Sequence, residues 1–178
     1  MKTFSFLPIR ILCVLYFGCV LVSTVYAQAK NCNCCTQKHK VFDFWKGEWK
    51  VFTPDGKLAG TNTIEKIQND CILRENWIST NAGFTGTSYN FYNANTGQWE
   101  QLWIDNQGQS LHLKGGLING SMVLQSSPLI QKDGSKLINK VTWTPLKQGQ
   151  VRQLWETKKG DAAWVTVFDG TYKPISQE

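Results

Sequence analysis

Residue types that often carry chemistry are scarce in this sequence. The chain of 178 residues has only two His and five Pro, and charged residues make up 18% of it. It contains no Gly-x-Ser-x-Gly and no Gly-rich phosphate loop, which argues against a hydrolase nucleophile elbow and a phosphate-binding turn. With 42% hydrophobic residues and no low-complexity segment, the chain has the composition of one globular domain.

Helical patterns are also missing. After residue 50 no segment carries an apolar stripe with helical spacing, and turn-forming pairs such as Asn119-Gly120 recur about every 11–15 residues. Between the turns lie segments rich in β-branched and aromatic residues, which predict ten strands. These are 49–53, 58–68, 71–79, 84–92, 98–105, 110–117, 122–126, 136–145, 151–158 and 164–173.

The short connections make sequential strands antiparallel neighbours. A meander of ten strands is near the size limit of an open sheet, and closing it removes both exposed edges. We therefore predict an all-β chain with a single antiparallel up-and-down β-barrel of about ten strands at residues 41–174, followed by a tail at 175–178. A barrel this wide is not filled by its own side chains and should hold a cavity.

The first 27 residues have the pattern of an export signal. Lys2 and Arg10 flank the apolar run 11–22, and Val25-Tyr26-Ala27 supplies small residues at the cleavage-specifying positions. We predict cleavage after Ala27 and an exported protein, periplasmic or secreted, without stable membrane insertion once the signal is removed. A lipoprotein attached through Cys19 is the weaker alternative.

The positive charge of the chain is mild and dispersed. Removal of residues 1–27 takes two basic and no acidic residues, which lowers the formal net charge from +6 to +4. Among the scattered basic residues only Lys158 and Lys159 are adjacent, so we expect a solvated surface and no nucleic-acid partner.

Four cysteines follow the predicted signal. Cys32, Cys34 and Cys35 lie in a lead-in at residues 28–40, and Cys71 begins a predicted strand. Because exported chains favour disulfides, we expect Cys71 to be bridged to one of the other three, and the remaining two to pair locally or stay reactive. A four-cysteine zinc site is the weaker alternative because Cys34 and Cys35 are adjacent, and we expect no metal.

Several motifs together resemble a known family. They are FDFWKGEW at 42–49, CILRENW at 71–77, GTSYN at 86–90, WEQLWID at 99–105, VRQLWE at 151–156 and FDGTY at 168–172. In this order they resemble a family of exported bacterial proteins without an established activity, described as lipocalin-like or nitrobindin-like barrels. The resemblance covers residues 41–173 and implies a calycin-type fold. In lipocalins an Arg of the last strand packs over the Trp of the Gly-x-Trp motif, and here Lys173 is the candidate for that place.

Strand alternation predicts which side chains line the cavity. Residues i and i+2 share a face, so three strands each carry a Trp two residues from a carboxyl or amide group. If these faces point inward, they form a Trp-walled ligand site, whose predicted members are Glu75, Trp77, Asn90, Gln101, Trp103, Gln153 and Trp155. The alternatives are a fully packed core, or a register in which these faces point to solvent.

Two residues are candidates for chemistry. Glu75 beside Trp77 would have a raised pKa in a dry cavity and could act as an acid or base, although an ion pair with Arg74 or Arg152 is the more conservative interpretation. His112 lies in mid-strand; nitrobindin-type barrels bind haem through one His, but a lone strand His is more often a surface residue, and we expect no cofactor.

The sequence therefore favours an exported lipocalin-like barrel that binds a small amphipathic or polar organic ligand. The absence of an assembled triad, metal site or phosphate loop favours binding over catalysis. An enzyme that acts on a small organic substrate through Glu75 is the alternative, and a barrel with a structural or envelope role is a third.

Overall fold

The structure is a computed structural model, and it describes Met1 and residues 32–175. Two short helical segments, α1 (Gln37–Lys40) and η1 (Asp43–Trp45), precede the strands. The strands are β1 (Gly47–Phe52), β2 (Leu58–Ile67), β3 (Ile72–Ser79), β4 (Thr85–Asn93), β5 (Gln98–Asp105), β6 (Ser110–Ile118), β7 (Ser121–Gln125), β8 (Leu129–Ile130), β9 (Lys136–Pro145), β10 (Val151–Lys159) and β11 (Val165–Pro174). Each of the ten predicted strands is present. Apart from Met1, the predicted signal peptide lies outside the described part, as do residues 28–31 and the last three residues.

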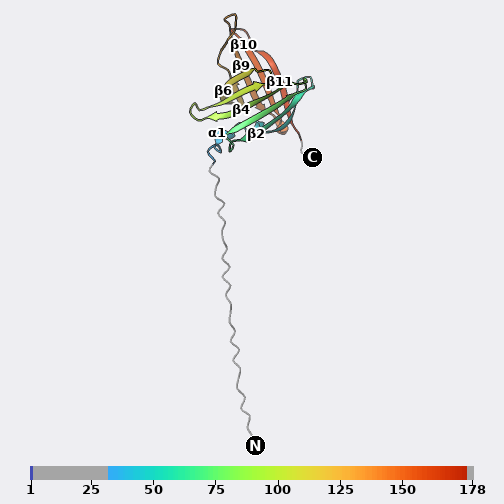
Figure 1. Ribbon diagram of the computed structural model, residues 1–178, viewed down its shortest axis with the longest axis vertical. Helices are drawn as coiled ribbons and strands as arrows, with labels where there is room; N and C mark the ends of the chain where they lie inside the picture. Colours follow the sequence, from blue (N-terminus) through green and yellow to red (C-terminus); the bar gives the residue numbers. More distant parts are fainter. Residues whose placement is uncertain (2–31, 176–178) are drawn as a thin grey trace. The chain divides into compact units, whose positions relative to one another are not determined.

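Ten of the strands close into an antiparallel barrel. Each long strand pairs with its neighbour in the sequence, β7 pairs with β9, and β11 pairs back to β1, so the ring has no free edge. The two-residue β8, which the sequence did not predict, adds to β9 outside this ring. Figure 1 shows the strands wrapped around one interior. The predicted all-β barrel of about ten strands is confirmed.

Local backbone requirements explain two glycines. Asn119 and Gly120 join β6 to β7 with φ of 49° and 81°, as the predicted two-residue hairpin turn requires. Gly47 at the start of β1 has φ of 144°, a backbone conformation that side chains with a Cβ rarely adopt. The glycine of Gly47-x-Trp49 therefore lets the chain turn from η1 into the barrel wall.

The segment between the lead-in and β1, residues 41–46, closes one end of the barrel. Phe42 and Trp45 are fully buried, and their rings stack with centroids 5.1 Å apart. Phe42 also meets Trp99 and Trp143 edge-on, at 5.5 and 5.2 Å. We call this cluster, completed by Trp49, the aromatic plug. The buried aromatic residues of the FDFWKGEW motif, residues 42–49, thus close the barrel at the end where the chain enters it.

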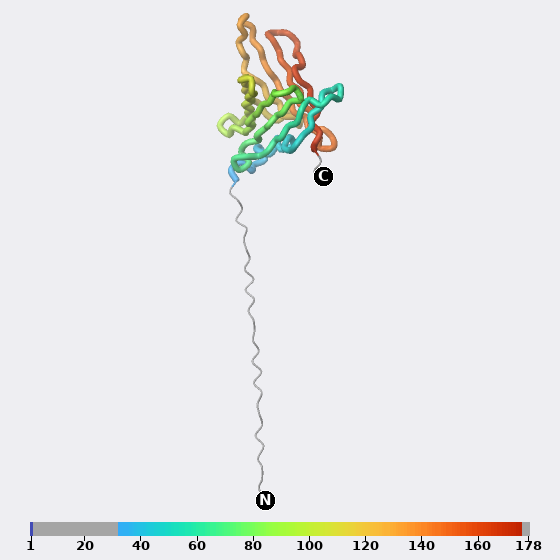
Figure 2. Tube along the Cα trace, turned by 45° about the vertical axis from the view of Figure 1, so that its right-hand side comes forward, coloured from blue at the N-terminus to red at the C-terminus, as the bar shows by residue number. Residues whose placement is uncertain are grey.

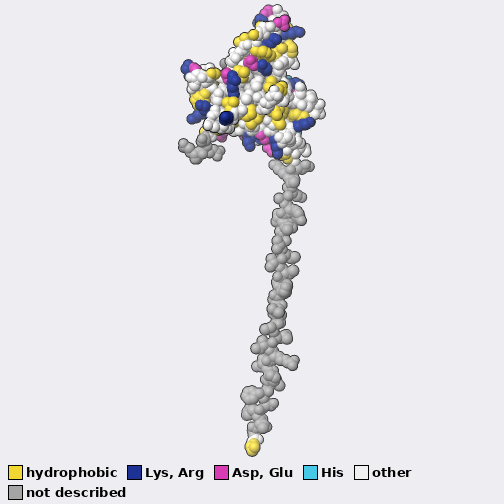
Figure 3. Space-filling model, turned by 180° about the vertical axis from the view of Figure 1, so that it is seen from behind, with side chains coloured by type: hydrophobic (Ala, Val, Ile, Leu, Met, Phe, Trp, Pro, Cys, Tyr) yellow, Lys and Arg dark blue, Asp and Glu magenta, His cyan; other side chains and the backbone are white. Residues whose placement is uncertain are grey.

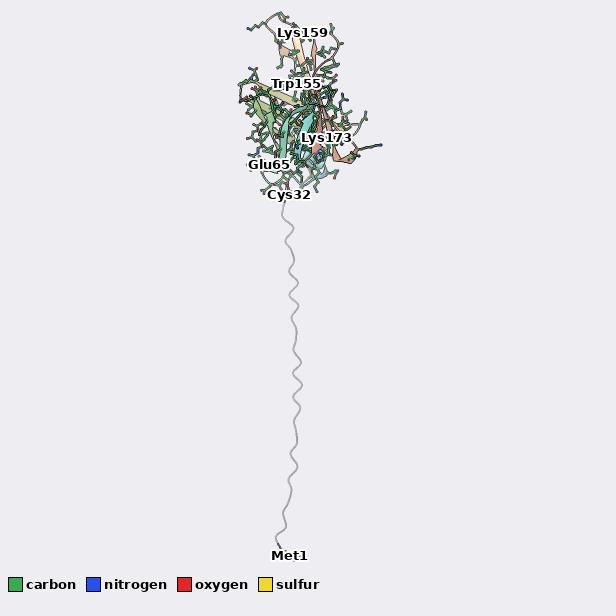
Figure 4. All side chains as sticks on the ribbon, turned by 90° about the vertical axis from the view of Figure 1, so that its right-hand side faces the viewer. Met1, Cys32, Glu65, Trp155, Lys159 and Lys173 are labelled. Carbon is green, nitrogen blue, oxygen red and sulfur yellow. A yellow bond between two sulfur atoms is a disulfide. The ribbon has the colours of Figure 1, made fainter. Side chains whose placement is uncertain are left out.

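Two disulfides fasten this end. Of the three partners left open for Cys71, the structure pairs it with Cys34, and Cys32 is bonded to Cys35. The Cys34–Cys71 bridge ties the lead-in to the residue before β3. In Figure 4 the labelled Cys32 lies at one end of the barrel and Lys159 at the other, with Trp155 between them.

The opposite end is extended by the β9–β10 hairpin. The two strands stay paired as far as Leu137 and Lys159, and Lys159 Nζ lies 2.6 Å from Asp133 Oδ2. Figure 2 shows these segments, orange and red-orange, rising side by side past the ends of the other strands. The hairpin gives this end of the barrel one raised side.

The outer surface of the described residues is mixed in character. On the face seen in Figure 3, basic side chains are scattered among acidic, apolar and uncharged ones. In the described part of the chain no helix is long and apolar enough to cross a membrane. Lys173, expected over the Trp49 indole, lies instead 4.8 Å from the centre of the Phe52 ring, because Trp49 points into the barrel and Lys173 points out.

Candidate functional site

The barrel contains a cavity of about 620 Å³ above the aromatic plug. Its mouth lies among the β1–β2, β3–β4 and β5–β6 turns, where Asp55, Thr80 and the last residue of β5, Asp105, line it. Aromatic side chains form most of its walls, and polar side chains form its floor. The aromatic members are Trp77, Phe84, Trp103, Trp155, Phe168 and Tyr172.

The predicted cavity residues lie on the inner side of the barrel. Six of them line the cavity: Glu75, Trp77, Gln101, Trp103, Gln153 and Trp155. The seventh, Asn90, is fully buried beneath them, where its Oδ1 accepts a hydrogen bond from Gln101 Nε2 at 2.9 Å. Strand alternation therefore places all seven on one side of the wall, and they converge on one concavity.

Glycines on neighbouring strands make room for two of the indoles. A Cβ at Gly86 would lie 2.2 Å from a ring carbon of Trp103, and one at Gly60 would lie 2.7 Å from Trp77. Real Cβ atoms do not come so close, so each indole occupies the space that another residue's side chain would take. Trp77 also meets Phe168 edge-on at 6.3 Å. These contacts fix both rings against the wall and leave the space between the walls open.

The third indole is held by a hydrogen bond. Trp155 Nε1 donates to Asn139 Oδ1 on the adjacent strand at 2.9 Å. This bond satisfies the one polar atom of the indole, so the rest of the ring is available as apolar wall.

One half of the floor is a directed chain of hydrogen bonds. Asn90 Nδ2 donates to the backbone carbonyl of Leu73 at 3.1 Å and to Ser88 Oγ at 2.8 Å. Because a carbonyl can only accept, this contact fixes the orientation of the Asn90 amide. Ser88 therefore receives a hydrogen and gives its own to Glu75 Oε2, at 2.6 Å.

The other half of the floor meets the same carboxyl group. Asn62 Nδ2 donates to Glu75 Oε1 at 2.7 Å and to Tyr172 Oη at 3.2 Å. The Tyr172 hydroxyl in turn donates to Gln153 Oε1. The ring of Tyr172 packs 6.2 Å from that of Trp45, so this residue belongs both to the cavity floor and to the top of the plug.

The pKa of Glu75 is raised above its ordinary range. Burial, which disfavours the charged form, is the main cause, and the hydrogen bonds from Ser88 and Asn62 oppose it. Burial also raises the pKa of Tyr172 well above its ordinary value, with the nearby Glu75 adding to the effect. Glu75 is therefore neutral over part of the pH range in which a solvated carboxyl group is charged.

The expected ion pair of Glu75 with Arg74 or Arg152 is wrong. Arg74 bonds to Glu65 on the outer wall, and Arg152 Nη2 lies 2.7 Å from Asp169 Oδ2. Arg74 is adjacent to the inward-facing Glu75, and Arg152 is adjacent to the inward-facing Gln153. Because successive side chains of a strand point to opposite faces, both arginines point outward.

His112 also lies on the outer wall. Its Nε2 is 2.9 Å from Glu100 Oε2, and its side chain is 49% exposed. An iron atom inside the barrel would be out of its reach, so the cavity residues do not fit a haem held through His112. The described residues also bring together Cys32, Cys35 and Asp70, but the two sulfur atoms are bonded to each other and cannot act as thiolate ligands.

Sequence reasoning missed three members of the floor. Asn62 and Tyr172 lie on strands without a conspicuous Trp-polar pair, and Ser88 is an ordinary member of a polar strand. Alternation puts Ser88 on the same face as Asn90, which was the available signal. The role of Asn62 depends on its register opposite Trp77, which only the paired strands reveal.

A scan against protein-family models finds no match for this chain, and a search of the curated proteins finds none either. The fold and the site nevertheless define a class. A closed antiparallel barrel of ten strands, plugged at one end and hollow at the other, is a lipocalin-like, calycin-type barrel.

Proposed function

We propose that this protein binds a small amphipathic or polar organic ligand inside the barrel. The observation that carries the proposal is the preformed cavity of about 620 Å³, which has indole walls and a floor of fixed polar groups. Ligand sites typically have volumes of about 300–1,000 Å³, mostly apolar walls and a few oriented polar groups.

The contrast between the two ends of the barrel supports binding over simple core packing. Trp45 and Trp143 in the plug are 0% exposed, whereas Trp77, Trp103 and Trp155 are only half-buried. Half-buried indoles inside a barrel are exposed to the cavity, where a ligand would gain contact area that the protein itself does not use.

Catalysis through Glu75 is the second candidate. Its support is a carboxyl group with a raised pKa on the cavity floor. Both of its oxygens, however, already accept hydrogen bonds from Asn62 and Ser88, and the other floor groups are amides and hydroxyls. A floor of this kind orients a ligand better than it transfers a proton.

We also propose that the protein is exported and that residues 1–27 are its signal peptide. Two disulfides are compatible with an oxidising compartment. The proposed kinship with exported lipocalin-like barrels rests on the FDFWKGEW motif and the order of the later motifs.

A fluorescence titration with the neutral dye N-phenyl-1-naphthylamine tests the binding proposal. The dye should bind the folded protein and accept energy from the cavity indoles. Trp103→Ala should reduce the affinity for the dye by about tenfold or more, which corresponds to about 1.4 kcal/mol of binding free energy. Trp164→Ala is the matched control, because that indole lies outside the cavity, against Lys140. Equal affinities of the two variants would contradict the proposal.

A further inference from the structure

Glu75 differs from the other acidic residues of the barrel. Seven carboxylates among residues 32–175 lie within 4.0 Å of a Lys or Arg nitrogen, and all seven are on the surface or outer wall. Glu75 is 3% exposed and lines the cavity floor, yet no basic group of the described residues lies that close to it. The most deeply placed carboxyl group is thus one that lacks a cation.

The hydrogen bonds around Glu75 are directed as an anion requires. The Leu73 carbonyl orients Asn90, Asn90 orients Ser88, and Ser88 donates to one carboxyl oxygen. Asn62 donates to the other oxygen. Both oxygens therefore face donors, an arrangement that favours the charged form. Burial opposes that form, and a positive charge brought in from the cavity would offset the opposition beyond what these hydrogen bonds do.

We propose that the cavity takes an organic ammonium ion, with its positive end on Glu75 and its apolar body between the indoles. This inference rests on the proposed function and names the ligand class. The walls suit the cation as well as the body, because Trp rings attract positive charge to their faces. The amide nitrogen of Gln101 donates hydrogen bonds to Asn90 and Ser88. Its carbonyl oxygen can therefore accept a second hydrogen from the ammonium group, beside the one on Glu75.

The floor is poorly suited to an anion or a sugar. The donor hydrogens that Asn62, Ser88, Asn90, Gln101 and Tyr172 are seen to use go to one another, to Glu75, to Gln153 or to the Leu73 carbonyl. The one cationic side chain lining the cavity is Lys57 at the mouth, and it is paired with Asp55 at 2.7 Å. Apart from the Gln153 amide nitrogen, for which the described residues show no hydrogen bond, the floor offers a ligand acceptor capacity and negative charge.

Binding of such a cation should displace a proton. The groups that face Glu75 from the surrounding strands are Asn62, Ser88, Gln101, Gln153 and Tyr172, and the charged groups at the cavity mouth are Asp55, Lys57 and Asp105. Burial raises the pKa of Glu75 in the free protein, and a bound ammonium ion would lower it again. Affinity should therefore rise with pH up to the raised pKa of the free protein, and one proton should leave for each cation bound below it.

The experiment compares two probes of nearly the same shape, phenethylamine and 2-phenylethanol, as competitors of N-phenyl-1-naphthylamine. In the wild-type protein the amine should bind at least about tenfold more tightly than the alcohol, since hydrogen bonds to charged groups exceed neutral ones by that much. Glu75→Gln should abolish this preference. Glu48→Gln is the matched control: it makes the same chemical change at an exposed carboxyl group of β1 that lies outside the cavity.

Calorimetry on the wild-type protein supplies a readout that needs no variant. Phenethylamine titrated in two buffers of different ionisation enthalpy should release protons at acidic pH, and 2-phenylethanol should release none. Equal affinity of amine and alcohol, or loss of the preference in Glu48→Gln instead of Glu75→Gln, would overturn the assignment. If the dye still binds in a Trp103-dependent manner, only the ammonium inference fails; if no probe enters the cavity, the binding proposal fails with it.

Discussion

The two ends of the barrel use the same residue type for different purposes. At the plugged end, Trp45, Trp49, Trp99 and Trp143 are at most 4% exposed and pack against one another and Phe42. At the open end, Trp77, Trp103 and Trp155 are half-buried and border a cavity of about 620 Å³. An indole count therefore does not distinguish a core from a ligand site, whereas the neighbours of each indole do.

The difference lies in what covers the rings. Phe42 and Trp45 enter the barrel from the segment before β1, so the plugged end is filled by residues that belong to no strand. No such segment covers the open end among residues 32–175, where Trp77 and Trp103 each pack against a glycine of the adjacent strand. The indoles at this end are positioned by the wall and have their free surface turned to the cavity.

The largest effect should come from truncating the plug. Trp45→Ala removes a fully buried indole and should lower the free energy of unfolding by about 3–5 kcal/mol. Trp103→Ala should cost clearly less, because part of its ring already faces open space. Denaturant titration of both variants measures the difference, and equal losses would mean that the two ends are packed alike.

Removal of the Cys34–Cys71 disulfide should have the second-largest effect on stability. Replacing Cys34 and Cys71 together by Ser opens a loop of sequence separation 37 and should reduce the free energy of unfolding by about 2–4 kcal/mol. Dye binding in the cavity should persist under native conditions, because the bridge lies at the plugged end. Loss of dye binding from a protein that is still folded would break the separation between the two ends.

A smaller effect should follow from crowding the cavity wall. Gly86→Ala places a methyl group where the Trp103 ring lies. It should lower the free energy of unfolding by about 1–3 kcal/mol and reduce the affinity for the dye, because the indole must shift. Gly116→Ala is the control, since nothing lies within 4 Å of a Cβ there. Thermal unfolding and dye titration of the pair check the prediction; a neutral Gly86→Ala would show that Trp103 is loosely held.

The smallest effect concerns the pH dependence of stability. Since the pKa of Glu75 is raised in the folded protein, the folded state keeps a proton that the unfolded chain has lost. Its contribution is complete below the unfolded pKa and declines as pH rises toward the folded value. Glu75→Gln should therefore gain stability relative to wild type between acidic and neutral pH. Parallel curves of the two proteins, measured by chemical denaturation across this range, would contradict the assignment.

Much of the barrel follows from local sequence. Turn pairs such as Asn119-Gly120 fix hairpins, period-two segments fix strands, and the number of strands implies closure. The cavity residues follow from alternation once one inward position is known, and the Trp-polar pairs of β3, β5 and β10 supply that position. These are short-range signals, and the structure contains each of the ten predicted strands.

What the sequence could not supply depends on contacts between distant segments. The plug by Phe42 and Trp45, the partner of Cys71 and the hydrogen bonds of Glu75 with Asn62 and Ser88 all join separate strands or the lead-in. The expected partners Arg74 and Arg152 point outward, as alternation already implies for residues adjacent to inward positions. Arg74 is next to Glu75 in the sequence, but its side chain lies on the opposite face of the barrel wall and pairs with Glu65.

A crystal structure of the protein soaked with phenethylamine tests the central claim most directly. The account predicts the aromatic ring of the amine between Trp77, Trp103 and Trp155, with its nitrogen within hydrogen-bond distance of a Glu75 carboxyl oxygen. A cavity that holds only water, or an amine bound solely on the outer wall, would contradict it.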